Sequence, residues 1–97
     1  MKSGKSLPQI CIVTVTGQDR VGIIARLADT MAESNINIVD VDQKIMEECF
    51  VMNMAVDISC SAIEISKIKK RLDKLGEEMS LNINIQDENI FKAMHRI

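Results

Sequence analysis

The sequence predicts one α+β domain in which the elements follow in the order β-α-β-β-α-β. Three observations predict it. The chain has 97 residues, which fits one domain. Four short runs rich in β-branched and other apolar residues are separated by polar turns, as in strands. Two segments between them carry apolar residues at steps of three and four, which is one face of a helix.

The first strand and the first helix are expected on either side of a glycine-bounded turn. Residues 9–16 are almost continuously apolar and β-branched, which predicts a central strand covered on both faces. The turn at 17–22 follows, and then an amphipathic helix of about 13 residues that ends at Ser34-Asn35. Its apolar positions are Ile23, Ile24, Leu27, Ala28 and Met31.

Residues 36–46 predict a second strand, which we expect at an edge of the sheet because polar residues occur on both of its faces. Glu47-Glu48 is a short polar break that suits a hairpin. One face of the strand is expected to carry Asn37, Val39, Val41, Gln43 and Ile45. The other face is expected to carry Ile38, Asp40, Asp42 and Lys44.

The second half repeats the order of the first. Residues 49–58 alternate strictly, so Phe50 and the apolar residues at every second position after it should face the helices. Ser61 and Glu64 match a capping box, which predicts that the second helix begins there. Gly76 weakens the expectation for its last turn. The apolar face of this helix consists of Ile65, Ile68, Leu72, Leu75 and Met79.

Residues 81–86 alternate as a half-buried fourth strand does, and the tail at 87–97 predicts a short helix that docks on this subunit or on a neighbour. Residues 1–8 are polar and expected to be flexible. The folded unit is therefore expected to span 9–86. The economical arrangement is a ferredoxin-like split βαβ, a four-stranded antiparallel sheet with both helices on one face. The first and third strands would lie in the middle.

Composition argues against several classes of partner. The net charge is −2 and basic residues are interspersed with acidic ones, so neither nucleic acid nor an anionic membrane is an expected partner. Three cysteines without a metal-binding spacing are typical of a reduced, cytoplasmic protein. No metal or cofactor is predicted.

Catalytic patterns are also missing from the sequence. His95 is the one histidine, close to the C-terminus, and is interpreted as a surface or docking residue. Asp40 and Asp42 lie two apart on a strand and could hold a cation, but a solvated edge is the favoured interpretation. An acylphosphatase-like site built from Arg20 with Asn37 or Asn53 is chemically conceivable, although the loop pattern differs. We therefore expect no enzyme activity.

The turn at 17–22 opens directly into the first helix. A helix N-terminus carries N–H groups without intrahelical partners and a partial positive charge, so it suits a carboxylate. Asp19 or Arg20 is expected at the N-cap position, and Gly22 is expected to let the backbone approach a ligand or a strand closely.

The pattern Asp19-Arg20-Val21-Gly22, followed by Asn37-Ile38 at the start of the second strand, resembles an ACT domain. The chain most resembles the small stand-alone ACT proteins of bacteria and archaea, and more distantly the halves of the glycine-cleavage repressor. The resemblance implies a regulatory module that pairs with a second copy and binds an amino acid between subunits. A dimerising protein–protein interaction module without a ligand is the alternative. The binding residues implied are Asp19, Arg20, Val21, Gly22, Ile23, Asn37 and Ile38.

Overall fold

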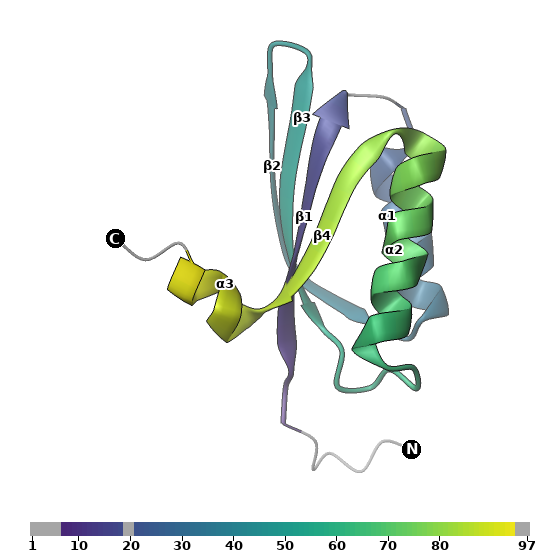
Figure 1. Ribbon diagram of the computed structural model, residues 1–97, viewed down its shortest axis with the longest axis vertical. Helices are drawn as coiled ribbons and strands as arrows, with labels where there is room; N and C mark the ends of the chain where they lie inside the picture. Colours follow the sequence, from purple (N-terminus) through teal and green to yellow (C-terminus); the bar gives the residue numbers. More distant parts are fainter. Residues whose placement is uncertain (1–6, 19–20, 95–97) are drawn as a thin grey trace.

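The computed structural model describes residues 7–18 and 21–94, and these form a single sheet, two long helices and a short third helix (Figure 1). The order of the elements is the predicted one. The strands are β1 (Ile10–Gln18), β2 (Asn37–Met46), β3 (Cys49–Asp57) and β4 (Leu81–Asp87). The helices are α1 (Ile23–Glu33), α2 (Ile65–Met79) and α3 (Glu88–Met94).

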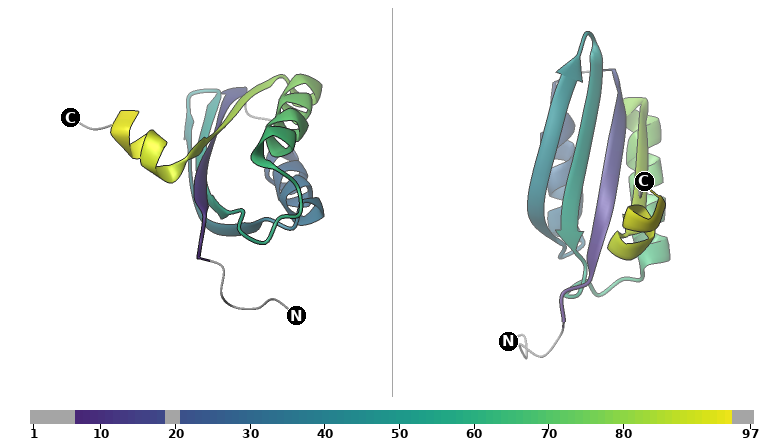
Figure 2. Two further views of the ribbon diagram at one scale, coloured as in Figure 1. Left: turned by 60° about the horizontal axis from the view of Figure 1, so that its bottom comes forward. Right: turned by 90° about the vertical axis from the view of Figure 1, so that its left-hand side faces the viewer.

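The sheet has the strand order β2-β3-β1-β4, and every neighbouring pair is antiparallel. Helices α1 and α2 cover one face, and the other face is open except where α3 stands beside it (Figure 2). The ferredoxin-like arrangement is confirmed, with β1 and β3 in the middle and β2 and β4 at the edges. β1 runs two residues further than predicted, because Gly17 and Gln18 still pair with β3.

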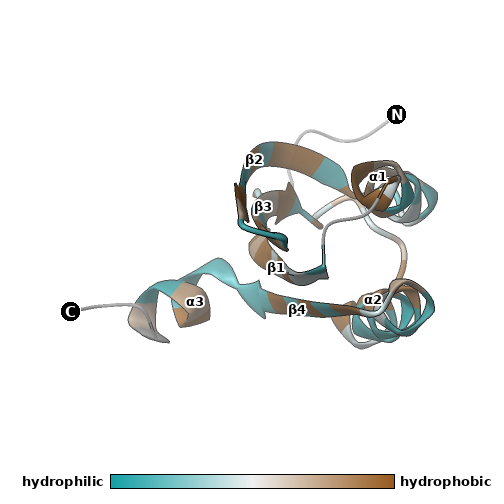
Figure 3. Ribbon diagram, turned by 90° about the horizontal axis from the view of Figure 1, so that it is seen from above, coloured by the Kyte–Doolittle hydropathy of each residue, from teal (hydrophilic) through white to brown (hydrophobic). Residues whose placement is uncertain are grey.

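The core lies between the sheet and the two long helices, and its side chains are aliphatic apart from Phe50 and a few methionines and Cys11. Residues 11, 13 and 15 of β1 are fully buried, as are alternate residues of β3. The hydrophilic sides of α1 and α2 face away from the sheet (Figure 3). Burial, together with the nearby carboxylate of Asp87, raises the pKa of the Cys11 thiol, whereas Cys49 and Cys60 are exposed.

A β-bulge divides β2 and overturns the predicted assignment of its faces. Ile38 pairs with Val56, but the next paired residue is Asp40, so Val39 is an extra residue. Because side chains alternate with a period of two, one extra residue moves every later side chain to the opposite face. Asn37 therefore does not share a face with Val41, Gln43 and Ile45, which lie with Ile38 on the side of the helices.

The start of α2 also differs from the prediction. The helix begins at Ile65 after an extended N-cap residue, Glu64, and no side chain caps it. The capping box is wrong because residues 61–64 form a turn outside the helix. There the Ser61 hydroxyl accepts a long hydrogen bond from the Ile63 N–H, at 3.4 Å. At the first helical position, Ile65 is 37% exposed, so it does not belong to the buried face.

Gly76 does not weaken the last turn of α2, which stays regular to Met79. The glycine is buried where the helix passes β4, and a Cβ built on it would lie 2.7 Å from the backbone oxygen of Leu81. The residue is therefore needed for close packing of helix against strand, a tertiary requirement that the local pattern does not reveal.

Replacing Gly76 with alanine is expected to lower the free energy of unfolding by about 1–2 kcal/mol. Alanine gains up to about 1 kcal/mol in helix propensity, but overpacking against a backbone atom costs about 1–3 kcal/mol. Urea denaturation measures the difference, with the exposed neighbour Glu77→Ala as the control. A Gly76→Ala protein as stable as the native one would show that the strand can move away at little cost.

Helix α3 continues directly from β4 and stands on the open side of the sheet, opposite α1 and α2 (Figure 1). It contacts β1 and β4 of its own chain. The N–H of Asn89 donates to the Asp87 carboxylate at 2.8 Å, which caps the start of the helix. Among residues 7–18 and 21–94, no helix has both the length and the apolar character to cross a bilayer.

Candidate functional site

The predicted site begins at the loop between β1 and α1. Asp19 and Arg20 lie outside the described residues, as does His95. The N-cap of α1 is Gly22, in the left-handed conformation with φ +91°, and no side chain caps the helix. The expected N-cap at Asp19 or Arg20 is therefore wrong. A glycine suits this position before the helix, because an L-residue at that φ would be strained.

The two glycines that bound the loop have different structural roles. A Cβ on Gly22 would meet nothing within 4 Å, so the glycine is needed for its left-handed backbone conformation and not for close packing. Gly17 is the glycine that needs space, because a Cβ there would lie 2.6 Å from Cδ2 of Leu81 and 3.3 Å from the oxygen of Ser80. Gly22 therefore approaches no strand closely, and Gly17 has that role toward β4. Close approach of a ligand to Gly22 stays a prediction.

A hollow of about 320 Å³ lies between the first turn of α1 and the far end of β2. It contains two of the predicted residues, Gly22 and Ile23, and Val21 next to it is 99% exposed. The sequence prediction missed the strand residues of this hollow, because the bulge that turns them toward the helix was not foreseen. The lining residues are Gly22, Ile23, Ile24, Ala25, Gln43, Ile45 and Phe50.

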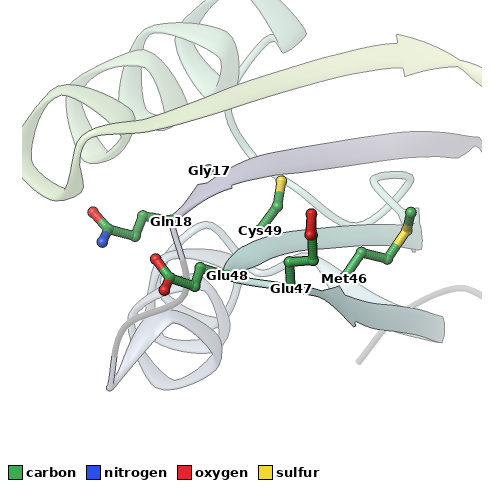
Figure 4. Close-up of a pocket in the computed structure, with 6 residues that line it drawn as sticks. All are labelled: Gly17, Gln18, Met46, Glu47, Glu48 and Cys49. Carbon is green, nitrogen blue, oxygen red and sulfur yellow. The ribbon is translucent and has the colours of Figure 1, made fainter.

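A second hollow, of about 460 Å³, lies on the other side of the same loop, between the end of β1 and the β2–β3 hairpin (Figure 4). Glu47 and Glu48 give it a negative rim, and Glu47 adopts a positive φ of 59° at the hairpin. Gln18 and Cys49 line it from paired positions of the two strands. This end of the domain therefore combines a helix N-terminus with two carboxylates.

Asn37 and Ile38 lie at the opposite end of the domain. The 11 residues of α1, about 16 Å of helix, separate Ile23 from the connection to β2. Asn37 is exposed beside a third hollow near Cys60, whereas Ile38 is half-buried against the core. Within one chain, the structure does not bring Asn37 or Ile38 together with Gly22 and Ile23.

The free edge of the sheet connects these two separated groups. β2 has a partner on one side only. Six of the nine large hydrophobic residues exposed in the described part lie along β2 and around the start of α1. Large contiguous patches of exposed apolar residues are typical of interaction surfaces in general. We call these six residues the edge patch: Val21, Ile24, Val39, Val41, Ile45 and Met46.

The alternative chemistries find little support in the described residues. Asn53 lies on the open face of the sheet and accepts a hydrogen bond from the Thr14 hydroxyl at 3.2 Å, away from the helix start. Asp40 and Asp42 are both exposed, and the Asp40 carboxylate accepts the N–H of Val41 at 2.9 Å. In residues 7–18 and 21–94 no three His, Cys, Asp or Glu side chains gather as they would around a metal ion.

Comparison with known proteins gives consistent matches. A family model described as ACT domain matches residues 9–86. A UPF0237 protein of Clostridium acetobutylicum is 48% identical over 86 residues, covering 89% of this chain and 97% of its own length. A UPF0237 protein of Methanocaldococcus jannaschii is also 48% identical, over 89% and 96%. The expected likeness to small proteins of bacteria and archaea is confirmed.

Two solved structures have the same fold. An ACT domain protein from Streptococcus pneumoniae superposes with a TM-score of 0.76 at 31% identity, over 92% of this chain and all of its own. A putative glycine cleavage system transcriptional repressor gives a TM-score of 0.72 at 25% identity, over 84% of this chain. The match covers 46% of the repressor, about half of that protein, as the sequence resemblance predicts.

Proposed function

Because the chain belongs to the ACT domain family, we propose that it is a non-catalytic regulatory module of the cytoplasm that binds an amino acid between two copies of itself. Residues 9–86 form the binding unit, and 87–97 are a C-terminal extension. The observation that carries the proposal is the edge patch, which follows β2, a strand with a partner on one side only, and the start of α1, where Gly22 and Ile23 lie. The likeness to a protein named as a repressor supports a regulatory role.

A second copy would unite the divided site. If two β2 strands pair antiparallel, the start of one strand lies beside the end of the other. Asn37 and Ile38 of the second copy would then come close to the α1 start of the first copy, where Gly22 and Ile23 lie. The same pairing would cover the edge patch and give β2 the partner that it lacks within the chain. The predicted site residues lie in two separate groups within one chain, as expected for a site that two chains form together.

The charges at this end of the domain fit the two ends of an amino acid. The first turn of α1 suits a carboxylate, since its N–H groups have no partners within the helix. Glu47 and Glu48 on the hairpin suit an ammonium group, as does Asp19 from the loop. The amide of Asn37 can both donate and accept, so it fits either end.

A dimer without a ligand is the second candidate function. The edge patch alone would favour pairing of two copies, because its residues are apolar and exposed. Val21, which is 99% exposed beside the hollow, would serve such a contact without any small molecule. The two functions differ in one measurable respect, which is whether an amino acid stabilises the protein.

A thermal-shift screen against the twenty amino acids is expected to identify at least one that stabilises the protein. At a concentration 100 times its dissociation constant, a ligand adds about 2.7 kcal/mol. For a domain of this size, that free energy corresponds to a rise in Tm on the order of 10–20 °C. A light-scattering mass measured on the same sample is expected to correspond to two chains.

Two results would decide against the proposal. A dimer that none of the twenty amino acids stabilises would favour the interaction module. A monomer at micromolar concentration, with or without amino acids, would contradict both functions, because both require the β2 edge to be paired.

A further inference from the structure

We propose that the side-chain amide of Gln43 selects the ligand, and that the ligand is an amino acid whose own side chain is neutral and forms hydrogen bonds. This inference rests on the proposed function, and it concerns the hollow between α1 and β2. The ligand class is that of amide and hydroxyl side chains, as opposed to aliphatic or charged ones.

Gln43 occupies a position at which the rest of the sheet is apolar. It pairs with Met52, which is 1% exposed, and the row continues through Val15 to Ile83. This row points toward the helices. Across the four strands, one other polar side chain, Asp87, shares this face, and it lies at a strand end where it caps α3. Gln43 is the polar residue in the middle of an otherwise apolar pattern.

The exposure of the edge strand does not explain why position 43 carries a polar residue. Val41 and Ile45, two residues before and after it on the same face, are 44% and 57% exposed and are nevertheless apolar. Strand patterns are ordinarily broken where a function requires it. The Gln43 side chain is exposed, and its amide offers two donors and an acceptor. A ligand group that enters the hollow would be able to form hydrogen bonds with the Gln43 amide.

The remaining lining fixes the kind of side chain that fits. Ile23, Ile45 and Phe50 supply apolar surface, and none of the lining residues is charged. A charged ligand side chain would therefore lose its hydration without meeting a counter-ion. An aliphatic side chain would leave the amide of Gln43 unpaired in the closed interface. A hydroxyl or amide satisfies it, and sites that hydrogen-bond a group discriminate against analogues that lack the group.

Two pairs of amino acids of similar shape test the inference. Calorimetric dissociation constants are measured for asparagine against leucine and for threonine against valine. The native protein is expected to prefer the polar member of at least one pair by about tenfold or more, the worth of one hydrogen bond in an enclosed site. Gln43→Met, which keeps the length and removes the amide, is expected to abolish or invert that preference.

Lys44→Met is the matched control, because residue 44 is adjacent, exposed and on the opposite face. It is expected to keep the native preference. Equal preferences in the native and Gln43→Met proteins, or a native preference for leucine and valine, would overturn the role of Gln43 alone. Failure of all four amino acids and of the wider screen to bind would overturn the proposed function as well, so the two failures are distinguishable.

Discussion

Replacing Leu72 with alanine is expected to lower the free energy of unfolding by about 2–5 kcal/mol. The side chain is 1% exposed and lies on the face of α2 that packs against the sheet. Its removal loses the transfer free energy of the buried carbons and leaves a cavity that the neighbouring side chains fill only in part. The total free energy of unfolding of a domain of this size is about 5–15 kcal/mol, so the substitution removes a large share of the stability. Chemical denaturation at a fixed protein concentration measures the change.

Leu7→Ala is the matched control for this substitution. The same side chain is 83% exposed there, so its truncation is expected to change the stability by less than about 0.5 kcal/mol. Similar losses at Leu7 and Leu72 would contradict the described core, because only Leu72 is buried.

A glutamate in place of Val41 is expected to weaken the proposed dimer by about 100-fold or more. Val41 lies in the middle of β2 and belongs to the edge patch. In a pair related by two-fold symmetry, the substitution places two like charges in one interface, and like-charge juxtaposition costs several kcal/mol. The valine is already 44% exposed in one chain, so the isolated fold should tolerate the change. Sedimentation equilibrium over a range of concentrations measures the dissociation constant.

Ile90→Glu gives the control on a different surface. Ile90 is 55% exposed on α3, on the other side of the sheet from α1. This variant is expected to associate as the native protein does. If Ile90→Glu were monomeric while Val41→Glu remained a dimer, the subunits would meet through the open face of the sheet and not through β2.

The parts of the fold that were predicted correctly are those in which one local pattern suffices. Residues 49–58 alternate strictly, and the alternate apolar residues from Phe50 are buried. The poor alternation of 36–46 correctly indicated an edge strand. The same irregularity concealed the bulge, because one extra residue shifts the face of each later side chain and the register is visible only in the pairing with β3.

Other differences depended on contacts distant in sequence. The local pattern predicts that Gly76 weakens the helix, whereas the glycine lets the helix approach Leu81. Ser61 and Glu64 had the spacing of a capping box, but the chain between them turns before the helix begins. Asn37 was grouped with the first loop from family resemblance, whereas one chain places them at opposite ends. That the predicted site residues of the first loop and of β2 contact a ligand stays a prediction.

The bulge at Val39 and the hydrogen bond from the Val41 N–H to Asp40 also bear on solubility. A long, flat edge strand with exposed β-branched residues is a template on which further chains can stack without limit, as in fibrils. The bulge interrupts the straight run, the Asp40 carboxylate occupies a backbone donor, and charged side chains alternate along the rest of β2. These features restrict which strands can add to this edge. The chain therefore exposes apolar residues along β2 while these features oppose open-ended stacking of further chains.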